Sequence, residues 1–147
     1  MANITLTALN PVAVTGVNAD PQISYDWNIK TDVLTATAAI ADVIYTPTLD
    51  LIQANPKCNR IAFQKIGNIA AADVMSIQTS VDGTNWYTAP VYNGGVAGGT
   101  ATSAVSIAEL ALVGLPAMRY VRGAITLAGT AMAGRTTQRI AVALLRL

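Results

Sequence analysis

Residues 75–88, MSIQTSVDGTNWYT, combine an alternating strand pattern, a tight turn and two adjacent aromatic residues. The first half alternates apolar and polar side chains, which is typical of a strand with one buried face. Asp82-Gly83 is a strong turn signal between two strands. Trp86 and Tyr87 follow, in a chain that is only 5% aromatic. The stretch therefore predicts two strands joined by a turn, with a tryptophan beside the corner.

The same two-residue period recurs along the chain, in residues 4–8, 119–127 and 140–144. Short clusters of Asn, Asp, Gly and Pro separate these runs, as in antiparallel sandwiches and barrels. Only residues 37–44 and 106–112 are helix candidates, and the former fits a strand equally well. We predict an all-β antiparallel β-sandwich of the jelly-roll type, with at most one or two short helices.

The length of 147 residues suits one domain with a single core. We expect the sandwich to occupy residues 29–147. Residues 1–28 contain Asn10-Pro11, Gly16 and Asp20-Pro21 between short apolar pieces, and they form either an ordinary first strand or an extended arm that pairs with another chain. No window approaches the roughly 18 apolar residues of a membrane-spanning helix, so we expect a soluble protein with no secretory signal.

The chain contains no histidine and one cysteine, Cys58. The usual metal ligand and the usual general base at neutral pH are therefore missing. Asp26 with Asp32, or Asp73 with Asp82, could form a carboxylate pair, but aspartates near turns more often bind local backbone amides. We expect no enzyme, no catalytic residues, no metal and no cofactor.

Other ligand motifs are incomplete. Asp82-Gly83-Thr84-Asn85 begins like a calcium loop but lacks the further acidic ligands. The glycine-rich residues 92–103 lack the lysine of a phosphate loop, and a partner-contacting loop is the better interpretation. Arg119, Tyr120 and Arg122 are the only basic and aromatic cluster, in a chain of net charge +1, so we expect no nucleic-acid binding.

Charge is distributed unevenly along the sequence. Residues 1–109 hold four Lys or Arg against eight Asp or Glu, whereas the rest holds five arginines and no acid. The opposite charges either mix on the folded surface or serve docking and head-to-tail self-association. The final run RIAVALLRL is apolar on both faces, which indicates a strand that is covered on both sides or packed against a neighbouring subunit.

Exposed aromatic rings offer a second hypothesis, because sandwich modules hold saccharides by stacking them on Trp or Tyr. Trp86, Tyr87 and Tyr92 could form such a platform, and so could Tyr25 with Trp27. The alternative is that Trp86 folds back and closes the core.

Three stretches in order resemble a known pattern: NRIAFQKIG at 59–67, MSIQTSVDGTNWYT at 75–88 and LPAMRYVRGAITLAGT at 115–130. Together they look like the jelly-roll sandwiches of discoidin-like domains and of bacteriophage capsid cement or decoration proteins. The resemblance covers roughly residues 47–147. Discoidin-like lectins usually carry a signal peptide and a disulfide, so the phage proteins are the better match. The residues that carry this scaffold signature are Asp82, Gly83, Trp86, Arg119, Tyr120 and Arg122.

The resemblance implies a structural virion protein, made in the host cytoplasm, that binds the outer capsid surface and stabilises the shell. Its partners would be the major capsid protein and further copies of itself, as a dimer or trimer, with no nucleic acid and no membrane. The alternative is a carbohydrate- or receptor-binding module of a tail or fibre. Candidate partner contacts lie in the arm, the glycine-rich loop and the C-terminal region: Ile4, Leu6, Asn93, Gly94, Gly95, Arg135, Arg139 and Arg146.

Overall fold

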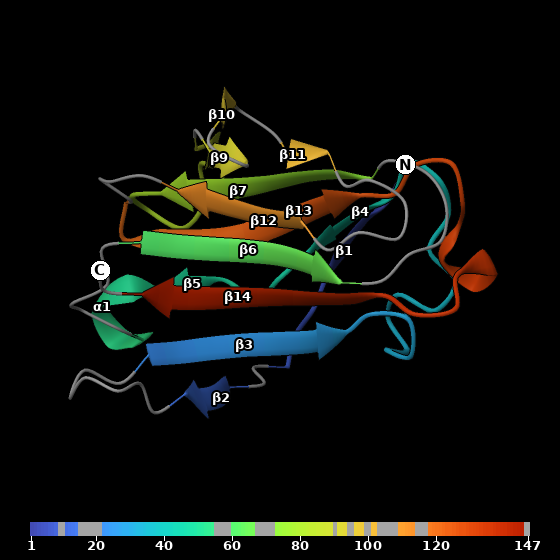
Figure 1. The fold of residues 1–147 in the computed structure, drawn as a ribbon, viewed down its shortest axis with the longest axis horizontal. Coiled ribbons are helices and arrows are strands. Elements are labelled where there is room, and N and C mark those ends of the chain that lie inside the picture. The colour runs from blue at the N-terminus through green and yellow to red at the C-terminus, as the bar shows by residue number, and fades with distance from the viewer. Residues whose placement is uncertain are drawn as a thin grey trace.

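The computed structural model describes residues 1–8, 11–14, 22–54, 60–66, 73–89, 91–93, 96–98, 101–102, 109–113 and 118–145. Two sheets face each other across one hydrophobic core, and the layer formed by β6, β14 and β3 is in front in Figure 1. The prediction of an all-β sandwich is confirmed. The jelly-roll connectivity stays a prediction.

One sheet is built around the predicted strand at 119–127. Its strands are β1 (Asn3–Thr5), β4 (Val43–Tyr45), β5 (Leu49–Asp50), β7 (Val74–Ser80), β8 (Tyr87–Thr88), β11 (Ala101–Thr102) and β13 (Tyr120–Thr126). The main order is β1-β4-β13-β7-β11, while β5 pairs with β13 and β8 pairs with β7. All pairs are antiparallel except β1 with β4. We call this the β13 sheet.

The other sheet is built around the final strand, which pairs with a neighbour on each side. Its members are β2 (Pro11–Val14), β3 (Gln22–Asn28), β6 (Arg60–Ile66), β9 (Val91–Asn93), β10 (Val96–Gly98), β12 (Glu109–Val113) and β14 (Arg139–Leu145). They follow the order β10-β9-β12-β6-β14-β3-β2, with every pair antiparallel. We call this the β14 sheet.

The helices of the described residues are short: α1 (Leu51–Ala54) and the 3₁₀ turn η1 (Met132–Gly134). Neither predicted helix forms where the structure describes it, since residues 43–45 lie in β4 and residues 109–112 in β12. The carboxylate of Asp42 binds the amides of Ala39 and Ala2 and fixes a turn before β4, so of the two structures that residues 37–44 fitted, the strand forms, from Val43 on. No helix among the described residues is long and apolar enough to cross a membrane.

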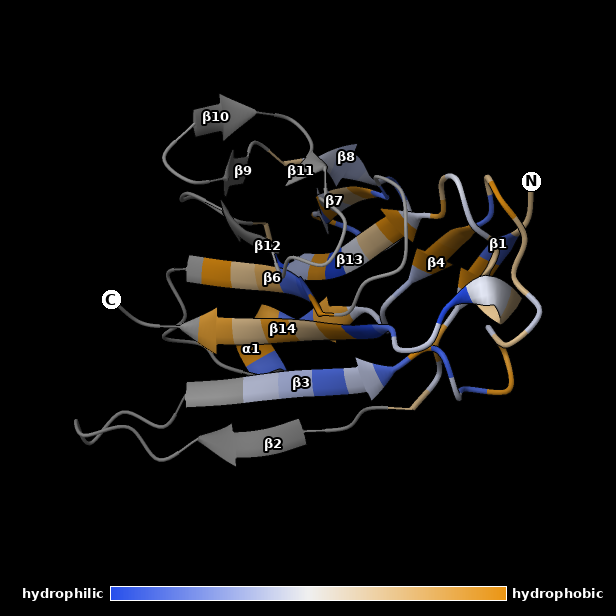
Figure 2. Cartoon of the chain, turned by 45° about the vertical axis from the view of Figure 1, so that its right-hand side comes forward, coloured by the Kyte–Doolittle hydropathy of each residue, from blue (hydrophilic) through white to orange (hydrophobic). Residues whose placement is uncertain are grey.

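The alternation of side chains puts the core between the sheets. Along β13 the inward-facing Val121, Gly123 and Ile125 are buried, whereas Tyr120, Arg122 and Thr126 on the other parity are half-buried and the small Ala124 is covered. Apolar and polar segments alternate along this strand in Figure 2. Phe63 of β6 reaches across from the other sheet: a Cβ on Gly123 would lie 2.9 Å from its ring. Glycine at this position therefore makes room for the aromatic ring.

The final strand is buried on one face only. Ile140, Val142 and Leu144 belong to the core, whereas Ala141 and Ala143 on the other face are half-buried. Contact of that second face with a neighbouring subunit stays a prediction.

The described part of residues 1–28 contributes strands to both sheets. β1 joins the β13 sheet beside β4, and β3 pairs with β14 in the other. Leu6 is 1% exposed and belongs to the core, and Ile4 packs against it. The prediction of Leu6 as a partner contact is therefore wrong for this conformation, because its side chain is needed inside.

Candidate functional site: an arginine between two aromatic rings

An arginine lies between two aromatic rings on the outer face of the β13 sheet. The Cζ atom of Arg122 is 4.0 Å from the centre of the Tyr45 ring and 4.2 Å from that of the Trp86 ring. Its Nε donates a hydrogen bond of 2.7 Å to Oε1 of Gln78. We call Arg122, Tyr45, Trp86 and Gln78 the Arg122 cluster.

Strand geometry brings these four side chains together. Val121 and Gly123 face the core, so Arg122 between them points to the outer face of the sheet. Gln78 is its direct cross-strand neighbour in β7. Tyr45 comes from β4 on one side of β13, and Trp86 comes from the segment between β7 and β8 on the other. The guanidinium is thus approached from two opposite sides.

The turn before Trp86 is fixed by Asp82. Its carboxylate accepts hydrogen bonds from the amides of Thr84 and Asn85, from Nδ2 of Asn85 and from Oγ of Ser80. These bonds hold the pKa of Asp82 well below its usual value. Gly83 takes the positive φ of 76° that the turn requires. This turn places Trp86 over the sheet face.

Burial lowers the pKa of Arg122, and the neighbouring Tyr45 opposes that shift. Arginine nevertheless stays protonated at neutral pH. Among the described residues, no carboxylate lies within ion-pairing distance of this guanidinium. The cluster therefore presents a positive charge that is partly shielded from water by two rings.

The predicted scaffold signature falls around this cluster. Asp82 and Gly83 form the turn between β7 and β8, and Tyr120 lies against Gly83. Trp86 is half-buried on the outer face and is not one of the core residues, so the hypothesis that it closes the core is wrong. Tyr87 beside it is 61% exposed.

The alternative aromatic platform does not exist on the surface. Tyr25 and Trp27 are stacked at 5.9 Å between ring centres, but both belong to the core. Trp27 also donates its Nε1 hydrogen to the Ala8 carbonyl oxygen. The hypothesis that these two rings bind a saccharide is therefore wrong.

The C-terminal arginines mix with the acidic residues of the earlier sequence. Arg119 forms an ion pair with Asp50 at 2.9 Å, and Arg139 forms one with Asp26. Arg139 and Asp26 join β14 with β3, and Arg119, which directly precedes β13, reaches Asp50 of β5. For these residues, the hypothesis that opposite charges from the two parts of the sequence lie side by side on the folded surface is the correct one. Arg139 is still exposed and stays a candidate partner contact.

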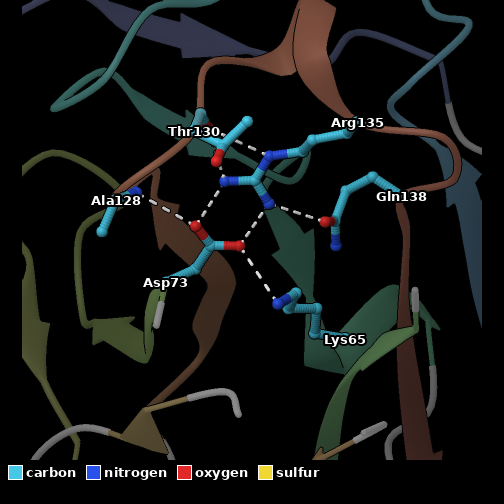
Figure 3. A network of polar contacts seen from close by, with 6 residues as sticks. All are labelled: Lys65, Asp73, Ala128, Thr130, Arg135 and Gln138. Atoms are coloured by element: carbon cyan, nitrogen blue, oxygen red, sulfur yellow. Dashed lines mark hydrogen bonds and ion pairs between the residues drawn. The ribbon is translucent and has the colours of Figure 1, made fainter. Parts of the chain in front are cut away.

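Arg135, another predicted contact, is buried instead. It binds Asp73 through two hydrogen bonds of 2.5 Å, and Nζ of Lys65 lies 3.2 Å from the same carboxylate (Figure 3). The prediction of Arg135 as a surface contact is wrong, because its charge neutralises an aspartate inside the sandwich. Asn93 lies in β9, where side chains are not described, and Gly94, Gly95 and Arg146 lie outside the described residues.

This buried network joins the two sheets at one end of the sandwich. Lys65 belongs to β6, Asp73 directly precedes β7, and Arg135 follows η1. Burial alone would raise the pKa of Asp73, but hydrogen bonds from Arg135 and the Ala128 amide, with the charges of Arg135 and Lys65, hold it below its usual value. The carboxyl group is thus ionised and fully engaged.

The predicted carboxylate pair Asp73 and Asp82 is not brought together. These residues stand at opposite ends of the seven-residue strand β7. Asp26 is held by Arg139, and Asp32 accepts a hydrogen bond from the Leu34 amide. Each of these aspartates has a structural partner within the fold.

Sequence reasoning missed Tyr45 and Gln78 in the Arg122 cluster, and Lys65 and Gln138 in the buried network. The burial of Lys65 could have been predicted from the sequence, because Ile61, Phe63 and Lys65 alternate along one strand and therefore point to the same face, the core. The role of Gln78 could not have been predicted, since its pairing with Arg122 joins positions that are 44 residues apart in the sequence.

The fold is similar to those of phage-derived proteins. The structure of the PBSX exported protein XepA matches with a TM-score of 0.60 at 12% identity, over 96% of this chain and 45% of XepA. The SPBc2 prophage-derived protein YomS matches with a TM-score of 0.53 at 6% identity, over 88% of this chain and 98% of YomS. The chain thus spans less than half the length of XepA. No protein-family model and no curated protein sequence matches it.

Proposed function

We propose that the protein is a structural component of a phage particle that binds the outer surface of the capsid and stabilises the shell, without catalysis. Support comes from a sandwich fold of the kind found in phage-derived proteins, together with the resemblance of its strand and turn motifs to cement proteins. The particle would carry it as a dimer or trimer in contact with the major capsid protein.

The observation that carries this proposal is the Arg122 cluster on the outer face of the β13 sheet. Arg, Trp and Tyr are the residues that most often dominate the binding energy of protein interfaces. Thr88, which pairs with Gln78, and Val74, which shares the outer face of β7 with Gln78, are exposed, so this face is accessible in the described part of the chain. Binding by this face would stabilise the shell by mass action.

The test is whether the protein copurifies with intact particles and binds capsids that lack it. We expect a fixed ratio to the major capsid protein, and a rise in the temperature at which the shell opens. Binding of Arg122→Ala should weaken more than binding of Arg139→Ala, whose arginine is exposed on the other sheet. Absence from purified particles, with no binding to bare capsids, would contradict the proposal.

A second candidate function is carbohydrate or receptor binding by a tail or fibre module. The observation that favours it is Tyr87, which is exposed next to the half-buried Trp86. A glycan array would then give a saccharide ligand, and Trp86→Ala and Tyr87→Ala would each abolish its binding while the thermal midpoint stays close to that of the wild type. Normal glycan binding by both variants would exclude this platform.

A further inference from the structure

The guanidinium of Arg122 has one edge left for an external ligand. Its Nε is taken by Gln78, and its faces lie against Tyr45 and Trp86. Among the described residues, no acceptor binds Nη1 or Nη2. These two nitrogens form the planar fork that binds a carboxylate through two parallel hydrogen bonds.

The acids whose side chains the structure describes already have partners; the side chains of Asp20 and Glu109 are not described. Arg119, Arg135 and Arg139 hold three of them, and turn amides hold the others; the six are Asp26, Asp32, Asp42, Asp50, Asp73 and Asp82. Asp82 is the acid whose turn carries Trp86, yet its carboxylate is saturated by its own loop. None of the acids whose side chains the structure describes is therefore left as a counter-ion for Arg122.

We propose that Arg122 binds the carboxylate of an aspartate or glutamate on a protein partner. This rests on the docking function proposed above and names its central contact. The two rings restrict the arginine side chain and keep water away, which strengthens an ion pair formed there.

Two other ligand classes fit less well. A saccharide would stack on ring faces, but the guanidinium already covers one face of Tyr45 and one of Trp86. A nucleic acid would need several free cations along its backbone. Here the three other described C-terminal arginines are paired with aspartates, which leaves Arg122 without cationic support.

The first measurement compares the affinity of Arg122→Lys and Arg122→Gln for bare capsids. Gln removes the charge, whereas Lys keeps it but loses the planar fork. We expect both to bind at least about tenfold more weakly than the wild type, with Gln the weaker. Arg119→Gln, which alters an exposed arginine that is already paired with Asp50, should bind within about twofold of the wild type. Circular dichroism and thermal melts verify that each variant is folded.

The second measurement needs no capsid. Oligoglutamate peptide is titrated into the protein while tryptophan fluorescence is recorded, with Trp86→Phe as the blank that leaves Trp27 as the only tryptophan. We expect a saturating change for the wild type that is absent in Arg122→Gln and absent with oligoglutamine. Glucuronate and inorganic phosphate are titrated in parallel, and a response to either that exceeds the response to the peptide overturns the proposal.

The two measurements separate the two proposals. If Arg122→Gln binds capsids as tightly as the wild type, the carboxylate site is wrong while capsid docking stands. If the wild type does not bind capsids but oligoglutamate still changes its fluorescence in a way that requires Arg122, the capsid assignment is wrong and the carboxylate site stands.

Discussion

At the scale of single residues, the fold places several charges where water cannot reach them. Asp73 is 0% exposed and is shared by Arg135 and Lys65. Two cations around one anion leave a net positive charge inside, which is tolerable only while the carboxylate stays ionised. Arg135 also donates to Oε1 of Gln138 and to the Thr130 carbonyl oxygen, which satisfies its remaining donors. The network is therefore sensitive to the loss of one negative charge.

We predict that Asp73→Asn lowers the free energy of unfolding by about 3–5 kcal/mol, because it leaves two buried cations without an anion. Urea denaturation at neutral pH measures this loss. Asp50→Asn is the matched control: it breaks an exposed pair with Arg119 and should cost less than about 1 kcal/mol. Equal losses in the two variants would contradict the role assigned to Asp73.

Asp82 gives a prediction about pH. Its hydrogen bonds lower its pKa in the folded protein, so the unfolded chain takes up a proton at a higher pH than the folded one. Its contribution to stability is present above the unfolded pKa of about 3.9 and is lost as the pH falls toward the folded value. Asp82→Asn should therefore show a smaller drop in thermal midpoint between pH 7 and pH 3 than the wild type.

The control for this pH effect is Thr84→Ala, which keeps the backbone amide that donates a hydrogen bond to Asp82. It should retain the wild-type acid dependence. A drop in Asp82→Asn as steep as that of the wild type would show that Asp42, Asp50 and Asp73, whose pKa values are also lowered, carry the whole effect.

At the scale of elements, β13 holds the β13 sheet together. It pairs with β4 and β5 on one side and with β7 along seven residues on the other. Its inner face carries Gly123 against Phe63, and its outer face carries Arg122. One strand thus contributes both to the core and to the proposed docking face.

We predict that Gly123→Ala destabilises the protein by about 1–3 kcal/mol, because the new methyl group would lie 2.9–3.2 Å from three atoms of the Phe63 ring. Adding Phe63→Leu should restore part of that loss. Urea denaturation of both single variants and the double variant gives the coupling energy. If the losses of the two single variants add up to the loss of the double variant, the two sites are not coupled, and the backbone at residue 123 moves away from the ring of Phe63 to make room for the methyl group.

The strands themselves were predictable because alternation is a local property. The run at 75–80 and the run at 119–127 became β7 and β13, and the turn at Asp82-Gly83 lies between β7 and β8 as expected. Which strands are neighbours was not predictable, since the pairing of Arg122 with Gln78 depends on the whole topology. For the same reason the sequence identified Trp86 and Arg122 separately and did not show that they touch.

At the scale of the whole molecule, two late segments of the sequence occupy inner positions of the sheets. β13 lies between β4 and β7, and β14 lies between β3 and β6. The ion pairs Arg119–Asp50 and Arg139–Asp26 form only when these strands insert beside the earlier ones. The uneven charge along the sequence is therefore neutralised only in the completed fold.

We predict that a chain ending after residue 138 does not form a stable sandwich, because β3 and β6 lose the partner between them and the core loses Ile140, Val142 and Leu144. A chain ending after residue 145 is the control and should fold. Dispersion of amide signals in NMR spectra distinguishes the two. A well-dispersed spectrum for the shorter chain would contradict the central role of β14.

The inner position of β14 also bears on how the protein is made. Until the ribosome has added residues 139–145, β3 and β6 have no neighbour to join them, and each keeps an unpaired edge. The β14 sheet is therefore completed only after both β3 and β6 have been synthesised. A message cut short before this point would yield polypeptides with open strand edges, which are prone to aggregation and accessible to proteases. Incomplete copies would thus be removed before they could compete with complete ones for places in an assembly.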